Sequence, residues 1–321
     1  MKLHQLRSLI AVAENGSIHE ASRALHITQP AVSKSLSDLE TELGAPLFVR
    51  SAKGAQLTPY GQSLIRHARA IEQELRHAHE DIATLLGVAR GTVTVGVTPV
   101  SSTGPFAAAL RAFSGDYPQV NVNVFELRPA QIQEGLADGS LDFGLVSRIG
   151  QPSDTRFYWE TLYTVPTTLA VRKDHPMRGA RSLRTLTDAR WLSWDALDDT
   201  TSLIGSMFSV QDIAPPKHVL RCTSTSLYAE MATTTDVVSL WSELPFHMPE
   251  YRTRLRKIAL HEPLPDMTIG LICRDIDLMT TMATTLIGLI RDAGTEFSGL
   301  FQRAGARPKK HAKPDDAERA G

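Results

Sequence analysis

The chain has 321 residues, of which 42% are hydrophobic and 21% are charged, and its formal net charge at pH 7 is −1. This length and balance predict two or more globular domains with full hydrophobic cores, and they exclude a disordered or strongly basic protein. No apolar run approaches the roughly 18 residues of a membrane-spanning helix and no export leader is evident, so we expect a cytoplasmic protein without membrane contact.

The first elements predicted along the chain are helices separated by short turns. Residues 3–15 have one apolar face at helical spacing. Residues 17–43 then predict two helices joined by a tight turn, with Ser17 and Glu20 forming a capping box at the start of the first. Helices with so brief a connection must cross steeply, which is typical of a helix-turn-helix.

The second helix of this pair has a polar pattern suited to DNA. Its N-terminal half offers small donors, an amide and a cation without any acid, and the acids begin only at Asp38. Such a helix can enter the DNA major groove with its N-terminal end. The alternative is an ordinary solvated amphipathic helix. The candidate DNA contacts include a capping residue and a proline in the first turn: Thr28, Gln29, Pro30, Ser33 and Lys34.

A hairpin and a long helix are predicted next. Gly54 is the turn residue of a hairpin over residues 51–56, and a helix begins at Thr58-Pro59. A helix lying on a domain core would need a broader apolar stripe than this one has. We therefore expect the helix to dimerise the chain, so that two weakly basic heads bind DNA together. Its apolar residues follow coiled-coil spacing: Leu64, Ala68, Ile71, Leu75, Ala78, Ile82 and Leu85.

From Thr92 onward the sequence predicts strands alternating with helices, and hence a parallel sheet covered on both faces. A second set of strands follows, and a last strand and helix return to the first half. Two α/β halves joined by two crossings imply a cleft at the hinge. The predicted strands are residues 93–97, 120–127 and 141–146, then 168–172, 191–193, 219–222 and 237–240, and finally 268–273.

Polar residues gather where several of these strands end, and ligands of open α/β sheets bind outside such carboxyl ends. Segments 98–103 and 200–202 are rich in hydroxyls and open helices, whose N-termini favour anions. We expect a small organic acid, an aromatic carboxylate or sulfonate, with Trp194 as a flat apolar wall. The alternatives are that these hydroxyls only cap helices and that Trp194 is a core residue. Further candidates are Arg128, Ser147 and Ser226.

No catalytic or metal-binding motif emerges. GxSxG, HExxH, Walker and GxGxxG patterns are absent, and His77 and His79 belong to the polar flanks of the long helix. Cys222 and Cys273 lie far apart in strand-like runs, where we expect buried packing residues rather than a redox pair. We therefore expect neither an enzyme nor a resident cofactor.

The N-terminal segment resembles the winged helix-turn-helix of the LysR-type transcriptional regulators. The resemblance covers LRSLIAVAENGSIHEASRALHITQPAVSKSLSDLETELGAPLFVR over residues 6–50, followed by Leu57-Thr58 and Gly61. It implies that the first turns of the second helix face DNA and that Arg50 and Lys53 lie at the wing, near phosphates.

The remainder resembles the effector domain of these regulators, which is similar in fold to periplasmic binding proteins. The matching stretches are YPQVNVNVFEL, LADGSLDFGLV, the DHP at residues 174–176 and DVVSLW at residues 236–241. The resemblance implies an effector near Thr98, Ser101 and Ser202. With the strand-end residues, the candidate effector contacts are Thr98, Val100, Ser101, Ser102, Arg128, Ser147, Thr201, Ser202 and Ser226.

Together these observations predict an α/β multidomain regulator that binds double-stranded promoter DNA, a small organic acid and itself, as a homodimer or homotetramer, with RNA polymerase as a further candidate partner. The alternative is a small-solute-binding protein or enzyme with an accessory helical head. The predicted parts are a winged helix-turn-helix (1–58), a linker helix (59–88), an effector-binding domain (89–303, lobe I about 89–164 and 267–303, lobe II about 165–266) and a disordered tail (304–321).

Overall fold

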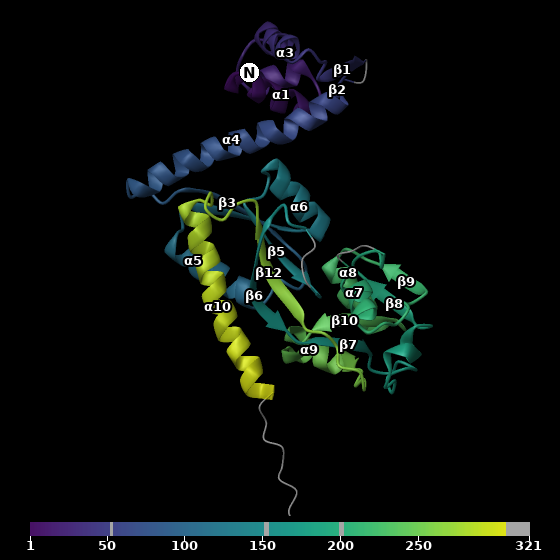
Figure 1. Ribbon diagram of the computed structural model, residues 1–321. Helices are drawn as coiled ribbons and strands as arrows, with labels where there is room; N and C mark the ends of the chain where they lie inside the picture. The colour runs from purple at the N-terminus through teal and green to yellow at the C-terminus, as the bar shows by residue number, and fades with distance from the viewer. Residues whose placement is uncertain (52–53, 151–153, 199–201, 306–321) are drawn as a thin grey trace, which may run out of the picture.

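The computed structural model describes residues 1–51, 54–150, 154–198 and 202–305. It has an N-terminal head, a long helix and two α/β lobes (Figure 1). The long helix lies between the head and the first lobe, and the second lobe sits beside the first. This arrangement confirms the predicted fold class.

The head packs helices against a short antiparallel hairpin around a small apolar core. Leu9, Val12 and Val32 are fully buried in that core, which also receives the first turns of the long helix. The spacing of the apolar residues therefore orients each helix as predicted. The elements of the head are α1 (Leu3–Asn15), α2 (Ile18–Ala24), α3 (Gln29–Leu43), β1 (Phe48–Ser51) and β2 (Gly54–Leu57).

The helices α2 and α3 and their short turn confirm the predicted helix-turn-helix, but the predicted caps at the starts of the two helices form only in part. Ser17 Oγ accepts the backbone N–H of Glu20 at 3.1 Å, whereas the Glu20 carboxylate lies 3.6 Å from Arg23, so only half of the predicted capping box forms. Thr28 precedes α3 without a side-chain cap bond. His26 adopts a left-handed conformation (φ 55°), which turns the chain within a few residues.

The helix α4 (Pro59–Leu85) begins as predicted, with Thr58 Oγ1 accepting the Gly61 N–H at 3.1 Å. Contrary to the prediction of a solvated flank, His77 is buried, and its Nε2 lies 2.9 Å from Asp142 Oδ1 on the first lobe. The chain leaves the helix at Gly87 and enters the first strand of the lobe at Gly91, both with positive φ.

Lobe I is built on a five-stranded sheet in the order β4-β3-β5-β12-β6. The strands β3, β4 and β5 run parallel as predicted, but β12 lies antiparallel between β5 and β6, so the sheet is mixed. Helices α5 and α10 cover one face and α6 covers the other (Figure 1). The elements are β3 (Gly91–Val97), α5 (Pro105–Asp116), β4 (Val120–Glu126), α6 (Pro129–Asp138), β5 (Phe143–Arg148), β6 (Tyr158–Val165), β12 (Met267–Cys273) and α10 (Thr281–Gly305).

Lobe II has a second five-stranded sheet, in the order β11-β7-β10-β8-β9. Its strands β10, β8 and β9 are parallel, while β7 pairs antiparallel with β10 and β11. The strands β6 and β11 and the helix α9 were not predicted. The elements are β7 (Thr167–Arg172), η1 (Leu183–Leu186), β8 (Arg190–Ser193), α7 (Leu203–Val210), β9 (His218–Arg221), α8 (Thr225–Thr234), β10 (Val238–Ser242), η2 (Leu244–His247), α9 (Pro249–Arg254) and β11 (Leu255–Lys257).

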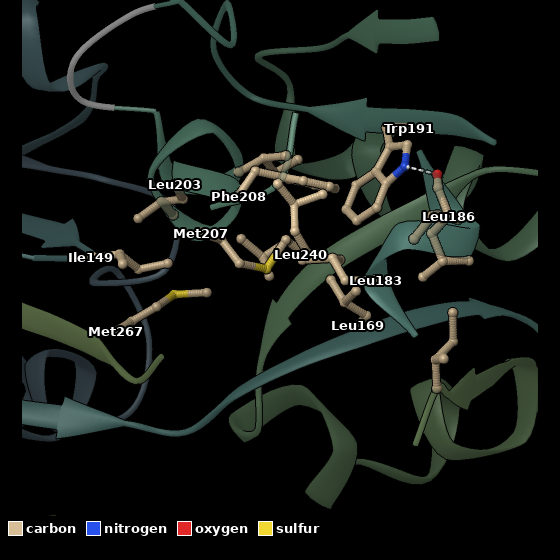
Figure 2. Close-up of a cluster of buried hydrophobic side chains, with 14 of the residues drawn as sticks. Ile149, Leu169, Leu183, Leu186, Trp191, Leu203, Met207, Phe208, Leu240 and Met267 are labelled. Carbon is tan, nitrogen blue, oxygen red and sulfur yellow. Dashed lines mark hydrogen bonds between the residues drawn. The ribbon is translucent and has the colours of Figure 1, made fainter. Parts of the chain in front are cut away.

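One of the apolar clusters of lobe II continues into lobe I (Figure 2). Ile149 and Met267 of lobe I lie beside Leu203 and Met207 of α7. The indole N–H of Trp191 is satisfied inside this core by a 2.8 Å bond to the carbonyl of residue 186. The lobes are therefore held together by buried apolar surface.

The C-terminal part follows the prediction, with the last strand and helix returning to lobe I. The helix α10 extends to Gly305, two residues into the tail predicted over residues 304–321. Residues 306–321, most of the predicted tail, lie outside the described residues. Both Cys222 and Cys273 are buried and unpaired, as expected, and burial raises the pKa of the Cys273 thiol to about 12, which keeps it unreactive.

Candidate DNA-binding surface and effector cleft

The N-terminal half of α3 presents an uncovered polar surface while its apolar face is buried in the head. Pro30 sets the backbone of the first turn without needing a hydrogen bond there. The helix N-terminus leaves free N–H groups that attract phosphate. The predicted contacts Thr28, Gln29, Pro30 and Lys34 are exposed, and Ser33 is half-buried beside them.

The acids of α3 lie toward its other end, where two of them hold the fold. Glu40 Oε1 accepts the backbone N–H groups of Leu47 at 2.6 Å and of Phe48 at 3.3 Å, which sets the entry to β1. Glu42 pairs with the N-terminal amine of Met1. The first turn of α3 thus keeps a surface without negative charge.

The hairpin β1–β2 is attached to the end of α1 by a 2.8 Å bond from the Ala55 N–H to the Gly16 carbonyl. A wing is therefore present beside the helix-turn-helix, as predicted. Of the two predicted phosphate contacts, Lys53 lies outside the described residues, and for Arg50 only the backbone is described.

A cavity of about 470 Å³ lies between the two lobes. Its lobe I wall comprises the ends of β3, β4 and β5 and the start of α6, and its lobe II wall comprises the ends of β8 and β9 and the start of α7. Strand ends thus meet across the cavity, as expected for open α/β sheets. Its volume is that of a small-molecule site.

Hydroxyls from separate strands converge at the lobe I wall. Thr98 Oγ1 lies 2.9 Å from Ser147 Oγ and accepts the Ser147 N–H, also at 2.9 Å. Ser101 is fully buried beneath them, where its Oγ accepts the Thr98 N–H at 3.0 Å and donates to the Leu145 carbonyl at 2.6 Å. Thr98 and Ser147 line the cavity, whereas Ser101 supports Thr98 from behind.

Of the other predicted effector contacts, some line the cavity and others do not. Val100 lines the cavity. Ser102 Oγ instead donates to the carbonyl of residue 99 at 2.7 Å, and the fully buried Ser202 caps α7 by accepting the N–H of residue 205 at 3.1 Å. These two fit the alternative interpretation as local caps. Ser226 is exposed at the start of α8, outside the cavity lining, and Thr201 lies outside the described residues.

An aromatic wall closes the cavity on the lobe II side. Trp194 lines it and stacks on Tyr228, with ring centroids 4.3 Å apart and planes 9° apart. Burial raises the pKa of Tyr228, so the phenol stays neutral and donates to the Leu240 carbonyl at 3.1 Å. The Trp194 ring is thus held flat against a fixed support.

Charged residues also line the cavity, and the sequence analysis identified only Arg128 among them. Arg221, Glu126 and Asp195 complete the set. Arg221 and Glu126 had been placed inside predicted strands, but β9 and β4 end at these residues, which brings both to the cleft. A charged residue near the carboxyl end of a predicted strand is the sequence feature that could have identified them.

The comparison with protein families decides the identity of the chain. The LysR substrate binding domain matches residues 87–295, and the bacterial regulatory helix-turn-helix protein of the lysR family matches residues 3–62. The chain belongs to the LysR family of bacterial transcriptional regulators.

Three similar proteins illustrate the family. The regulator GbpR of Azospirillum brasilense is 27% identical over 245 residues, 75% of this chain and 72% of GbpR. Full-length CbnR complexed with its target DNA (TM-score 0.62, 18% identity) covers 91% of this chain and 100% of its own. Full-length LysG of Corynebacterium glutamicum with bound effector Arg (TM-score 0.63, 18% identity) covers 92% and 99%. At these identities the two structures share the fold.

Membership of the LysR family decides between the two functional hypotheses. The members are regulators with a DNA-binding and an effector-binding domain and are not enzymes, so the alternative of an enzyme is wrong. Within the described ranges no group of three or more His, Cys, Asp or Glu could hold a metal ion. Among the described helices, none combines the length and apolar character needed to cross a membrane.

Proposed function

We propose that this LysR regulator binds operator DNA through the start of α3 and the wing, as a homodimer or homotetramer in the cytoplasm, and that a small organic anion in the interlobe cleft changes this binding. RNA polymerase is proposed as a further partner. Residues 1–58, 59–88 and 89–303 would be the DNA-binding, dimerising and effector-binding parts. The main support for a ligand-controlled regulator is the cleft, because its walls come from both lobes.

The DNA-binding part of the proposal rests on the exposure of the first turn of α3. Gln29 and Lys34 stand in solvent on a helix whose opposite face is buried, so they are available to base edges and phosphates. CbnR, which shares the fold, has been solved with its target DNA.

Self-association is supported by the apolar residues of α4. Leu64 packs on the head core and Ala68 is buried in it, but the rest of the predicted seam is not covered by the described chain. An uncovered apolar stripe along a helix favours pairing with a second copy. The exposed seam consists of Ile71, Leu75, Ala78, Ile82 and Leu85.

The effector class is supported by the walls of the cleft. Thr98 and Ser147 offer hydroxyls, Arg128 offers a cation, and Trp194 offers a flat apolar face. This combination suits an aromatic carboxylate or sulfonate. A ligand that touches both lobes would stabilise one relative placement of the lobes, and its binding energy would shift the regulator toward that state.

A gel-shift titration with the DNA upstream of the gene tests the proposal. We expect a specific shift that competitor DNA does not remove and that an aromatic acid alters. The variants Gln29→Ala and Ser33→Ala should each weaken operator binding by roughly 1–3 kcal/mol per lost base contact, with unchanged circular dichroism.

Gln119→Ala is the matched control, because Gln119 is equally exposed but lies on lobe I. Normal operator affinity in both head variants would overturn the recognition-helix assignment. A shift that no acid alters would leave the DNA-binding role in place and overturn the effector class.

A further inference from the structure

Two arginines without ion-pair partners face the interlobe cavity from opposite walls. Arg128 stands at the start of α6 in lobe I, and Arg221 ends β9 in lobe II. Both are exposed, and within the part of the chain that the structure describes neither forms an ion pair. The Arg128 Nε donates to Gln131 Oε1 at 3.3 Å, which directs the guanidinium without neutralising it.

The two arginines flank a direct contact between the lobes. The hydroxyl of Thr225 donates to the Glu126 carboxylate, joining the end of β4 to the start of α8. Arg128 follows Glu126 by two residues and Arg221 precedes Thr225 by four. The two segments that carry the arginines are thus held next to each other at one side of the cavity, so a small molecule there can reach both.

Two acids line the same cavity, but they form no ion pair with the two arginines. Asp195 is buried, with 9% of its surface exposed, and interacts with other residues of its own chain. Glu126 accepts the Thr225 hydroxyl across the cleft. Neither acid forms an ion pair with either arginine, so both guanidinium groups keep hydrogen-bond donors for a ligand on their own wall.

Apolar side chains line the cavity beside these charges and the hydroxyls of Thr98 and Ser147. Val100, Leu127 and Leu203 line it together with the Trp194 ring, which is stacked on Tyr228. A ligand that satisfies this arrangement has an apolar body and an acid group at each end. Guanidinium groups bind carboxylates through paired hydrogen bonds, so each arginine suits one acid group.

We propose that the effector of this regulator carries two acid groups, one held by Arg128 on lobe I and the other by Arg221 on lobe II. This inference rests on the proposed function and specifies it, because it selects diacids from the wider class of organic acids. A diacid bridges the lobes, whereas a monoacid satisfies one wall only. The bridge therefore gives a diacid both affinity and control over lobe closure.

The test compares diacids with their own monoesters. Calorimetric titration of the full-length protein would use phthalate, isophthalate, terephthalate and adipate, each beside its monomethyl ester, which keeps the shape and removes one charge. We expect at least one diacid to bind about tenfold tighter than its monoester, the effect of one charge-assisted contact.

Substitutions assign that preference to the two arginines. Arg128→Gln and Arg221→Gln should each reduce the diacid-to-monoester affinity ratio to about one. Arg111→Gln on lobe I and Arg190→Gln on lobe II are matched controls, exposed and away from the cavity, and should retain the ratio. Glu126→Gln keeps the bond to Thr225 but removes a negative charge, and should tighten diacid binding several-fold.

Each outcome decides one proposal. Monoesters that bind as tightly as every diacid, or a ratio that survives either arginine substitution, would overturn the diacid inference while the proposed function stands. If no acid of either kind binds, the organic-anion effector of the proposed function fails as well, and operator binding in the gel shift remains the separate test of the regulator.

Discussion

Lobe I is joined to its two neighbours by buried contacts of opposite chemistry. Against α4 it presents a buried carboxylate, and against lobe II it presents apolar side chains. Hydrogen bonds have fixed partners and directions, whereas apolar contacts tolerate small displacements. The difference predicts that lobe I and α4 move as one body, while the two lobes adjust relative to each other when the cleft is filled.

The polar junction centres on Asp142. Its Oδ1 accepts Gln73 Nε2 at 2.7 Å and lies 2.9 Å from His77 Nε2, and its Oδ2 accepts the Thr94 N–H at 2.6 Å. Gly139 lies so close to α4 that a Cβ there would come within 2.2 Å of the Gln73 side chain. A change in the orientation of α4 would break the contacts of Gln73 and His77 with Asp142 together.

The apolar junction centres on Met267 at the start of β12. Its side chain is fully buried between strands of lobe I and the side chains of α7, as Figure 2 shows. Ile149 and Ile269 extend this surface from lobe I, and Leu203 and Met207 meet it from lobe II. Such a surface can shear by small amounts without leaving a buried polar group unpaired.

The largest expected effect comes from removing the buried carboxylate. Asp142→Ala leaves the N–H of Thr94 and the side chains of Gln73 and His77 without their acceptor, at a cost of about 3–5 kcal/mol. Hydrogen exchange should show α4 opening from lobe I, and operator affinity should no longer respond to effector.

The control is Asp138→Ala, which removes a partly exposed carboxylate 3.5 Å from Arg69 at the same junction. Its effect should stay below about 1 kcal/mol, as for exposed ion pairs. Equal losses in both variants would mean that burial of Asp142 is not what holds α4.

A smaller effect is expected at the apolar junction. Met267→Ala should cost roughly 3 kcal/mol by leaving a cavity, while Met267→Leu should cost less than about 1.5 kcal/mol because volume is conserved. Thermal unfolding measures both.

At Asp142 even the isosteric Asn variant should destabilise the protein, because the amide turns one acceptor into a donor. If Asp142→Asn were tolerated as well as Met267→Leu, the two junctions would not differ in the way proposed.

The smallest effect is expected at the ion pair between Arg291 and Glu160, which is partly exposed to solvent. Arg291 forms two 2.7 Å bonds to Glu160 and holds the pKa of that carboxyl below its usual value of 4.5. The stabilisation is therefore complete above pH 4.5 and is lost as the pH falls through the lower folded pKa. Glu160→Gln should cost about 0.5–1 kcal/mol at pH 7, discounted for solvent exposure.

Chemical unfolding of both proteins between pH 7 and pH 3 measures this difference, which should shrink toward the acid end. Glu296→Gln, at an exposed position of α10 without an ion pair among the described residues, should show no pH-dependent loss. A difference that grows on acidification would contradict the assigned cause.

Sequence reasoning predicted what depends on neighbouring residues. The end of α1, the α2–α3 turn and the start of α4 follow from caps, prolines and spacing within a few positions. The placement of Thr98, Arg128 and Ser147 at one cavity could be predicted because strand ends share one edge of a sheet. For Ser102 and Ser202 the structure shows local capping bonds, and a capping hydroxyl cannot be told from a ligand-binding hydroxyl in sequence.

What sequence reasoning missed depends on distant partners or on a single residue at a strand boundary. Asp142 was read as part of a strand, because its partners Gln73 and His77 lie 69 and 65 positions away. Arg221 was missed because the predicted strand ran one residue too far. Tertiary packing determines both the partners of Asp142 and the end of the strand at Arg221, and no local sequence pattern indicates either.

The central place of β12 has a consequence for synthesis of the chain. This strand fills the slot between β5 and β6, although more than a hundred residues separate it from them in sequence. During translation, β5 and β6 emerge early and keep unpaired edges until residue 273 has left the ribosome. Lobe II, whose strands all lie within residues 167–257, can fold first. A nascent chain that stalls before β12 exposes a template for misassociation, so translation of the residues between β6 and β12 is when this regulator most needs chaperones.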